Sequence, residues 1–218
     1  KFFAPTNLAW ASSNRSRTMD ELNLRYAVAD DLDFVSRVVT EVSEGIVECL
    51  FADLLPMQQA SDVLRLAFGR NVAPYVTENV ILAEVGDQTA GLLFSYDACE
   101  QQIPTLMENF LTAKRIDPVR EVLTATVDDA LWVNTLWVNP QFRGRGLAQL
   151  LLEVAADKAR DLSLKRIALH AFAENEAALG LYRKAGFEVL KEVTLGAPLS
   201  ARHPKGGRVL SKTLDTPA

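Results

Sequence analysis

The sequence predicts a mixed α/β fold in which helices flank a twisted, mixed sheet of six to seven strands. The main observation is the stretch 130–162, where an apolar strand runs into a loop with two glycines and then into an amphipathic helix. Elsewhere, short apolar runs alternate with segments of helical period. With 218 residues, 49% of them hydrophobic, we expect one domain over 23–214, preceded by an N-terminal extension over 1–22.

The first half of the domain is expected to hold a strand, two helices, a hairpin and a helical insertion. The strand ends at Asp30-Asp31, either of which could cap the next helix. Each helix shows apolar residues at helical spacing and stops near a glycine, and Gly86-Asp87 between two apolar runs is typical of a hairpin. The insertion has a Met- and Phe-bearing stripe that we expect to pack in the core, with a wall of the acceptor site as the alternative. The ranges are 24–29 for the strand, 32–45 and 57–69 for the helices, 80–85 and 89–96 for the hairpin, and 103–127 for the insertion.

The second half is expected to alternate strands and helices. Asn139-Pro140 ends the central strand, because proline cannot extend a ladder. Gly186 stops the second helix, and Lys205-Gly206-Gly207 turns the chain into the last strand as part of a hairpin. The ranges are 130–138, 165–172, 187–193 and 208–214 for the strands, and 147–162 and 175–185 for the helices.

The loop after the central strand is a candidate anion site. A strand, a glycine-rich turn and a helix together point free backbone N–H groups and the positive helix end at a phosphate. Gly144 and Gly146 leave room for phosphate oxygens, and Arg143 and Arg145 add charge. The loop is neither a P-loop nor a dinucleotide fingerprint, since it lacks Gly-Lys-Ser/Thr and Gly-x-Gly-x-x-Gly.

In context this loop resembles a known signature. Arg143-x-x-Gly146-x-Ala148 after a Leu-Trp-Val-Asn-Pro strand end is similar to the acyl-CoA signature of the GCN5-related N-acetyltransferases, the GNAT family. A second register, Gln141-x-x-Gly144-x-Gly146, also fits, but the first places Ala148 inside the helix, where the family has a small residue. The resemblance continues through the strand over 165–171, Asn175-x-x-Ala178-x-x-x-Tyr182 and Lys184-Ala185-Gly186-Phe187.

The resemblance implies the GNAT fold and acetyl-CoA as co-substrate, with no metal. Main-chain groups of Leu136 and Val138 would pair with the pantetheine arm like an extra strand, and amides over 144–149 would hold the pyrophosphate. Asn175 would contact the pantetheine, with a plain helix cap as its alternative. The implied cofactor-binding residues are Leu136, Trp137, Val138, Arg143, Gly144, Arg145, Gly146, Leu147, Ala148, Gln149 and Asn175.

Two side chains are candidates for catalysis. In most of the family, a tyrosine at the position of Tyr182 protonates the departing CoA sulfur, and an unperturbed tyrosine is protonated at neutral pH. The alternative for Tyr182 is packing at the core edge. His170 faces opposite to its apolar neighbours, at a position where some peptide N-terminal acetyltransferases of the family carry a glutamate that acts as base. It is expected to have a near-neutral pKa and to act as base, or else to be a hydrogen-bonded wall residue.

The implied function is transfer of an acetyl group to a primary amine of a small molecule or peptide, by direct attack in a ternary complex. The alternative is a non-catalytic acyl-CoA-binding regulatory or assembly protein, because Asn134 replaces the acidic residue that some histone-type members carry on the central strand. Residues over 45–59 would lie on the acceptor side. The basic group Arg202, His203, Lys205 and Arg208 is expected to be a solvated face or a contact for an acidic group.

Composition limits partners and compartment. A net charge of −5 disfavours nucleic-acid and membrane surfaces, and no apolar run reaches spanning length. The two cysteines and two histidines share no metal-like spacing, and free thiols are typical of the reducing cytoplasm, where we expect the protein to act. The sequence is compatible with a homodimer and leaves the oligomeric state undecided.

Overall fold

The computed structural model describes residues 22–54 and 58–215, so the expected extension over 1–22 lies, apart from Leu22, outside the described residues. The described strands form one sheet of seven, in the order β1-β2-β3-β4-β5-β7-β6. Only the central pair, β4 and β5, is parallel; the other neighbours are antiparallel. The strands are β1 (Leu22–Tyr26), β2 (Val80–Val85), β3 (Gln88–Asp97), β4 (Ala130–Val138), β5 (Arg166–Phe172), β6 (Glu188–Val193) and β7 (Gly207–Thr213).

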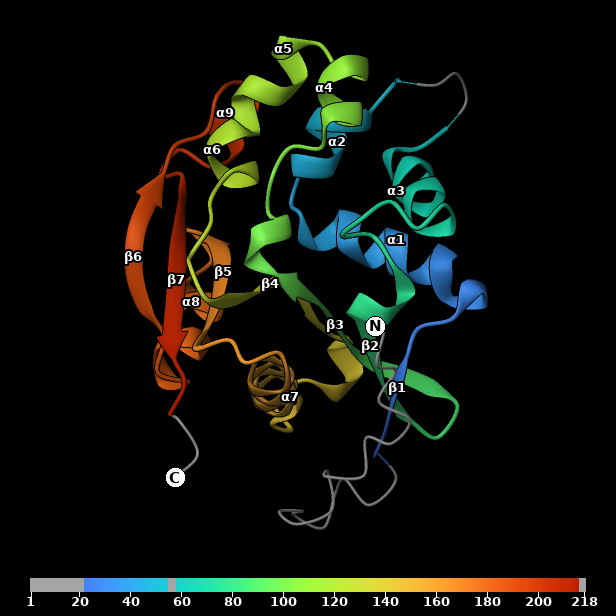
Figure 1. Ribbon diagram of the computed structural model, residues 1–218, viewed down its shortest axis with the longest axis vertical. Helices are drawn as coiled ribbons and strands as arrows, with labels where there is room; N and C mark the ends of the chain where they lie inside the picture. The colour runs from blue at the N-terminus through green and yellow to red at the C-terminus, as the bar shows by residue number, and fades with distance from the viewer. Residues whose placement is uncertain (1–21, 55–57, 216–218) are drawn as a thin grey trace.

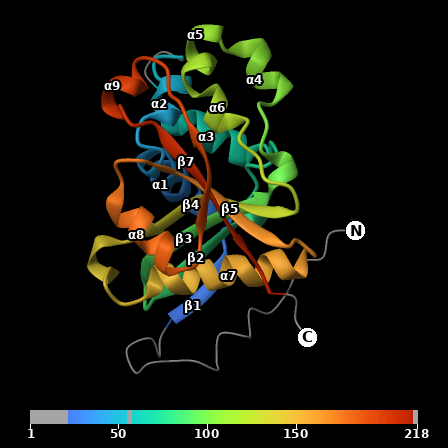
Figure 2. The ribbon, with the colours of Figure 1, turned by 90° about the vertical axis from the view of Figure 1, so that its left-hand side faces the viewer.

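Helices cover both faces of the sheet (Figures 1 and 2). One apolar cluster lies under α1 to α6 and α9, and a second lies under α7 and α8. The acceptor side expected from the sequence and the predicted acyl-CoA loop therefore belong to opposite faces. The helices are α1 (Leu32–Val42), α2 (Ile46–Phe51), α3 (Ala60–Gly69), α4 (Thr105–Phe110), α5 (Ala113–Ile116), α6 (Arg120–Leu123), α7 (Leu147–Asp161), α8 (Glu176–Lys184) and α9 (Leu199–Arg202).

A β-bulge bends β4 where it leaves β5. Phe94 pairs with Thr135 and the next residue, Ser95, pairs with Val133, so Asn134 is the extra residue on β4. In a regular strand, residues 132 and 137 would face opposite sides of the sheet. Because the bulge shifts the alternation, Trp132 and Trp137 both contact the cluster under α1. Beyond this point β4 and β5 separate, because their pairing ends at Val133 and Leu169.

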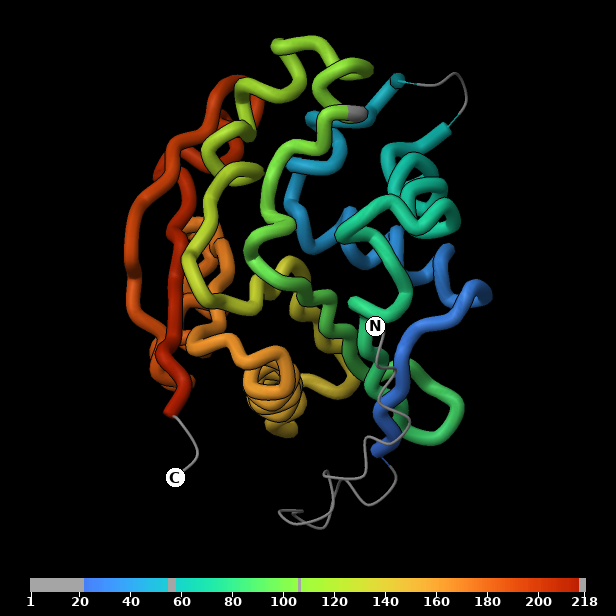
Figure 3. Tube along the Cα trace, in the orientation of Figure 1, coloured from blue at the N-terminus to red at the C-terminus, as the bar shows by residue number. Residues whose placement is uncertain are grey.

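The helical insertion packs against α2, although the two are far apart in the sequence (Figure 3). The Arg115 guanidinium donates to the carbonyl of Leu50 at 3.2 Å and so ties α5 to the end of α2. Met107 faces a cavity. The expectation that the whole stripe of α4 is core is wrong for Phe110, which is 71% exposed.

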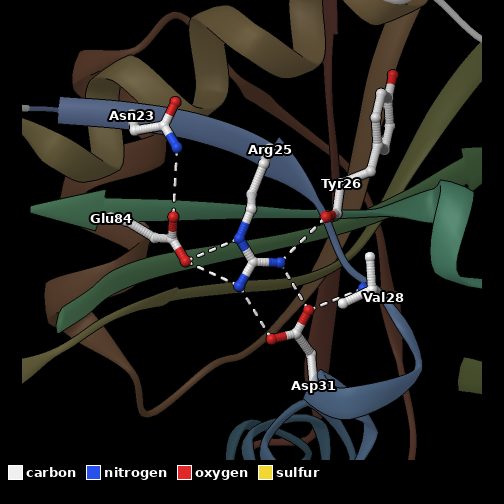
Figure 4. Close-up of polar contacts among 6 residues, drawn as sticks. All are labelled: Asn23, Arg25, Tyr26, Val28, Asp31 and Glu84. Atoms are coloured by element: carbon white, nitrogen blue, oxygen red, sulfur yellow. Dashed lines mark hydrogen bonds and ion pairs between the residues drawn. The ribbon is translucent and has the colours of Figure 1, made fainter. Parts of the chain in front are cut away.

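An arginine fixes the edge strand to the start of α1 (Figure 4). The guanidinium of Arg25 on β1 donates to Glu84 on β2 at 2.8 Å and to Asp31 at 2.7 and 3.0 Å. Its hydrogen bonds lower the pKa of the Asp31 carboxyl. Asp31 is the N-cap residue of α1, but its carboxylate accepts from the amide of Val28 at 2.8 Å, earlier in the chain, and caps no amide of α1.

Most expected elements occur within a few residues of their predicted ends, and three features differ from the prediction. Helix α2 was not expected, because six residues are too few to show a helical period. The expected hairpin between β6 and β7 is an antiparallel pair, but its connection is long and carries α9. Strand β1 begins at Leu22 and ends at Tyr26, before the apolar residues Ala27 and Val28.

Candidate acetyl-transfer site

The predicted anion site lies at the start of α7. Gly146 is the N-cap, and the first intrahelical bond runs from the amide of Leu150 to the carbonyl of Gly146. The amides of Leu147, Ala148 and Gln149 therefore have no intrahelical partner and point outward along the helix axis. No side chain caps them in the structure, so the positive end of a helix of 15 residues faces outward.

The two glycines of this loop meet both a backbone and a space requirement. Gly144 has φ 76° and Gly146 has φ 83°, which are left-handed conformations that glycine adopts without strain. A Cβ at either position would meet no atom within 4 Å. The space above the loop is open, as a cradle for phosphate oxygens requires.

The two arginines of the loop turn back toward the protein. Arg143 Nε donates to the carbonyl of Val138 at 3.1 Å, and the guanidinium of Arg145 lies 5.4 Å from the centre of the Phe142 ring. Both side chains are exposed, so each can rotate toward a bound anion at the cost of one weak contact.

The end of β4 offers a free strand edge beside β5. Leu136 and Val138 pack their side chains against the cluster under α7, while their backbone pairs with β3 on one side only. Trp137 points to the opposite face, with its ring 5.6 Å from that of Phe34 in an edge-to-face arrangement. Trp137 Nε1 is buried and has no partner among the described residues. The main-chain contacts expected for Leu136 and Val138 are compatible with this geometry.

Asn175 is the N-cap of α8. Its Oδ1 accepts from the amide of Ala178 at 3.1 Å, and its Nδ2 donates to Glu44 Oε1 at 3.2 Å. Asn175 therefore acts as a helix cap, which was the alternative to a pantetheine contact. A pantetheine contact through Nδ2 would require the bond to Glu44 to be exchanged.

Tyr182 lies on the inner face of α8, on the same side of the sheet as α7. Its ring packs 5.6 Å from Phe187, and its side chain is 8% exposed. Burial raises the pKa of the Tyr182 hydroxyl to about 12, so this group is protonated at all physiological pH values. No hydrogen bond of the hydroxyl occurs among the described residues.

A cavity of about 110 Å³ opens on the opposite face of the sheet, beside the bulge of β4. Its walls are mainly apolar and come from α1, α2, α3, the segment after η4 (Ala98–Glu100), β4 and β5. Residues of α2 that fall in the expected acceptor range, among them Ile46 and Leu50, line it. Several polar lining residues lie near the bulge: Tyr96, Gln101, Asn134, Thr135 and His170. Other polar lining residues include Ser43, Glu100 and Gln102.

Hydrogen bonds join most of the polar groups near the bulge in one chain. Thr135 Oγ1 donates to Asn134 Oδ1 at 2.9 Å, and Asn134 Nδ2 donates to the Tyr96 hydroxyl at 3.1 Å. Tyr96 in turn donates to Gln101 Oε1 at 2.6 Å, and Gln101 Nε2 donates to the carbonyl of Val122 at 3.1 Å. The chain holds the bulge residue Asn134 in a fixed orientation, which the sequence did not reveal because its members are far apart.

His170 lines the cavity from β5 and faces away from its apolar neighbours, as predicted. Burial, with repulsion from His203, lowers the pKa of His170 to about 4, so the expected near-neutral pKa is wrong. The ring leans over β7: a Cβ at Gly207 would collide with His170 Nε2, which has no hydrogen-bond partner in the part of the chain that the structure describes. Since β7 and β4 lie on opposite sides of β5, this nitrogen points away from the separation of β4 and β5.

His203 is buried and connects two turns of the chain, so the expectation that it belongs to a solvated face is wrong. It is 4% exposed, and its ring stacks on Phe172 at 3.7 Å between ring centres. Nε2 donates to the carbonyl of Glu44 at 3.0 Å, and Nδ1 lies 3.9 Å from the Glu174 carboxylate. The turn between α1 and α2 is thereby fixed to the turn before α8. No sequence signal marks this role.

Across 22–54 and 58–215, no group of three or more His, Cys, Asp or Glu side chains could hold a metal ion. In the same ranges no helix has the length and apolar character needed to cross a bilayer.

Comparisons with known proteins agree with this geometry. Residues 105–187 match the family model described as the acetyltransferase (GNAT) family. The uncharacterized N-acetyltransferase YdgE of Bacillus subtilis is 54% identical over 46 residues, which cover 21% of this chain and 29% of YdgE. The chain also spans less than half the length of further curated relatives, including acetyltransferases from bacteria, an archaeon and yeast.

Solved acetyltransferase structures share the fold. An N-acetyltransferase from Staphylococcus aureus Mu50 superposes with a TM-score of 0.61 at 21% identity, covering 87% of this chain and 99% of that structure. Spermidine N-acetyltransferase from Vibrio cholerae, solved with CoA and spermine, gives a TM-score of 0.55 at 16% identity, covering 88% and 95%. The stretch that carries the signature therefore matches the GNAT acetyltransferase family, and the fold of the chain is that of solved acetyltransferases.

Proposed function

We propose that this protein transfers the acetyl group of acetyl-CoA to a primary amine. The observation that carries the proposal is the separation of β4 and β5 after Val133 and Leu169. It lies between two features on opposite faces, the open amides at the start of α7 and the apolar cavity beside the bulge. A thioester held on one face could thus meet an amine on the other.

The residues at the loop fit a CoA ligand. Leu136 and Val138 would offer main-chain groups to the pantetheine, beside Trp137 and Asn175, and the amides of Gly144, Arg145, Gly146, Leu147, Ala148 and Gln149 would hold the pyrophosphate, with charge from Arg143. The open space over Gly144 and Gly146 supports this assignment. Acetyl-CoA supplies an activated acyl group, and the protein's part is to bind, orient and move protons.

In the proposed transfer, a C–N bond forms as the C–S bond breaks. Tyr182 gives its hydroxyl proton to the departing thiolate and recovers it from solvent, which its raised pKa permits because the hydroxyl is always protonated beforehand. The amine must lose one proton. His170 is neutral above about pH 5, but a base of pKa about 4 is a poor match for a reaction near neutrality.

We therefore expect no rising limb near pH 6 to 7 that belongs to His170. The value of kcat/KM should instead rise with the ionisation of the acceptor amine, because only the neutral amine attacks. The pH profile should be measured with two amines of different pKa, for wild type and His170→Ala. A limb that stays near pH 6 to 7 with both amines and disappears in His170→Ala would restore His170 as the base.

The proposal is tested by calorimetric titration with acetyl-CoA and by CoA release with a panel of amines and peptide N-termini. We expect binding with an affinity of about −5 to −8 kcal/mol and turnover with at least one acceptor class. Acetyl-CoA binding without turnover on any acceptor would instead favour a non-catalytic regulatory or assembly protein. The names of the relatives weigh against that alternative. The free thiols Cys49 and Cys99 suit a cytoplasmic enzyme.

A further inference from the structure

The cavity beside the bulge carries a single charged side chain. Among the residues that line it, Glu100 is the one carboxylate, and neither lysine nor arginine is present. The remainder is apolar, aromatic or neutral polar. A small cavity with this lining admits an apolar body and disfavours an anionic ligand.

The neutral polar groups near Glu100 are already satisfied by one another. The Tyr96 hydroxyl, Gln101 and Asn134 form the continuous chain that ends on the carbonyl of Val122. Glu100 directly precedes Gln101 but takes no part in this chain. In the described ranges, its carboxylate makes neither a hydrogen bond nor an ion pair, although it is partly buried.

The charges around Glu100 do not neutralise it. Burial raises the pKa of Glu100, the charge of Asp97 raises it further, and the charge of Lys158 acts in the opposite direction. Lys158 belongs to α7, and its Nζ donates to the carbonyl of Ser95 at 2.7 Å. Glu100 is thus a carboxylate at the cavity wall with no ion-pair partner among the described residues, an arrangement that costs stability unless a cation pairs with it.

We propose that Glu100 binds a second cationic group of the acceptor, so that the preferred substrates are amines with an apolar linker and a second ammonium, such as linear diamines. This inference rests on the proposed acetyl transfer. One amine would react where β4 and β5 separate, next to Asn134, while the apolar walls contact the linker and Glu100 pairs with the far ammonium. A charged hydrogen bond in a partly buried site favours such a ligand over its neutral isostere.

The test compares diaminopentane with hexylamine, which has a methyl group in place of the second ammonium. We expect wild type to prefer diaminopentane in kcat/KM by about 10-fold or more, as a charge-assisted hydrogen bond implies. Glu100→Gln should remove most of this preference, chiefly by raising the KM for diaminopentane, and should leave hexylamine within about 2-fold. The matched control is Glu188→Gln, exposed on the edge strand β6 and away from the cavity, which should change neither amine.

Binding of both amines in the presence of CoA, measured by calorimetry, separates this inference from the proposed function. Selective binding of diaminopentane that Glu100→Gln abolishes, without turnover, would support the subsite and overturn the proposed acetyl transfer. Turnover with no preference between the amines would overturn the subsite alone. An equal loss for both amines in Glu100→Gln would also overturn it, because Glu100 would then serve the chemistry or the fold.

Discussion

Tyr182→Phe is expected to lower kcat on the order of 100-fold while the affinity for acetyl-CoA stays unchanged. The substitution removes only the hydroxyl, and the ring keeps its contact with Phe187. Without this proton donor, the thiolate must leave unprotonated or take a proton from water. Turnover is followed by CoA release, and affinity by calorimetric titration.

A matched control is Tyr26→Phe. Tyr26 packs against the same apolar cluster, and burial likewise raises the pKa of its hydroxyl, but it lies on the edge strand β1. We expect this variant to retain wild-type kcat. If Tyr182→Phe also retains it at an unchanged melting temperature, Tyr182 is a packing residue and the proton comes from elsewhere.

The pH dependence gives an independent check on Tyr182. Because burial raises its pKa to about 12, its deprotonation should cause no fall in kcat below about pH 10. Near neutral pH, the dependence of the rate on pH should be set by the ionisation of the acceptor amine. A falling limb near pH 8 in wild type that vanishes in Tyr182→Phe would contradict this.

The sheet and its main helices could be predicted because their signals are local. Strand β4 was predicted with its observed ends, since proline stops it and apolar residues fill it. Helix α7 was predicted to start at Leu147, where the period changes, as observed. The short helices α2 and α9 were missed, because one or two turns carry no measurable period.

Only part of the candidate site was predictable from the sequence. A contiguous motif could be predicted, whereas properties that depend on burial and on contacts between distant residues could not. The glycine loop is a contiguous motif, so its place at the start of α7 followed from the sequence. The pKa of His170 did not, because it depends on packing by Phe172 and His203 and on the absence of a side chain at Gly207. The link between Tyr96 and Asn134 joins residues 38 positions apart and leaves no pattern in the sequence.

Gly146→Glu is expected to weaken acetyl-CoA binding by on the order of 100-fold or more. The new side chain would enter the open space over the loop, where the phosphates would bind, and add a like charge there. Two unit charges about 4 Å apart repel by about 4 kcal/mol near a protein surface, and each 1.4 kcal/mol is tenfold in affinity. An acidic residue at a helix N-terminus stabilises the helix, so α7 should remain folded.

Two controls separate charge from backbone strain. Gly146→Ala imposes the same penalty at φ 83° but adds no charge, and we expect it to weaken binding by less than about 10-fold. Gly86→Glu places the same side chain at another positive-φ glycine with open space, in the hairpin between β2 and β3, and should leave affinity unchanged. Calorimetry with acetyl-CoA measures all three. Equal losses in Gly146→Ala and Gly146→Glu would show that loop conformation alone controls binding, whereas wild-type affinity in Gly146→Glu would place the phosphates away from the start of α7.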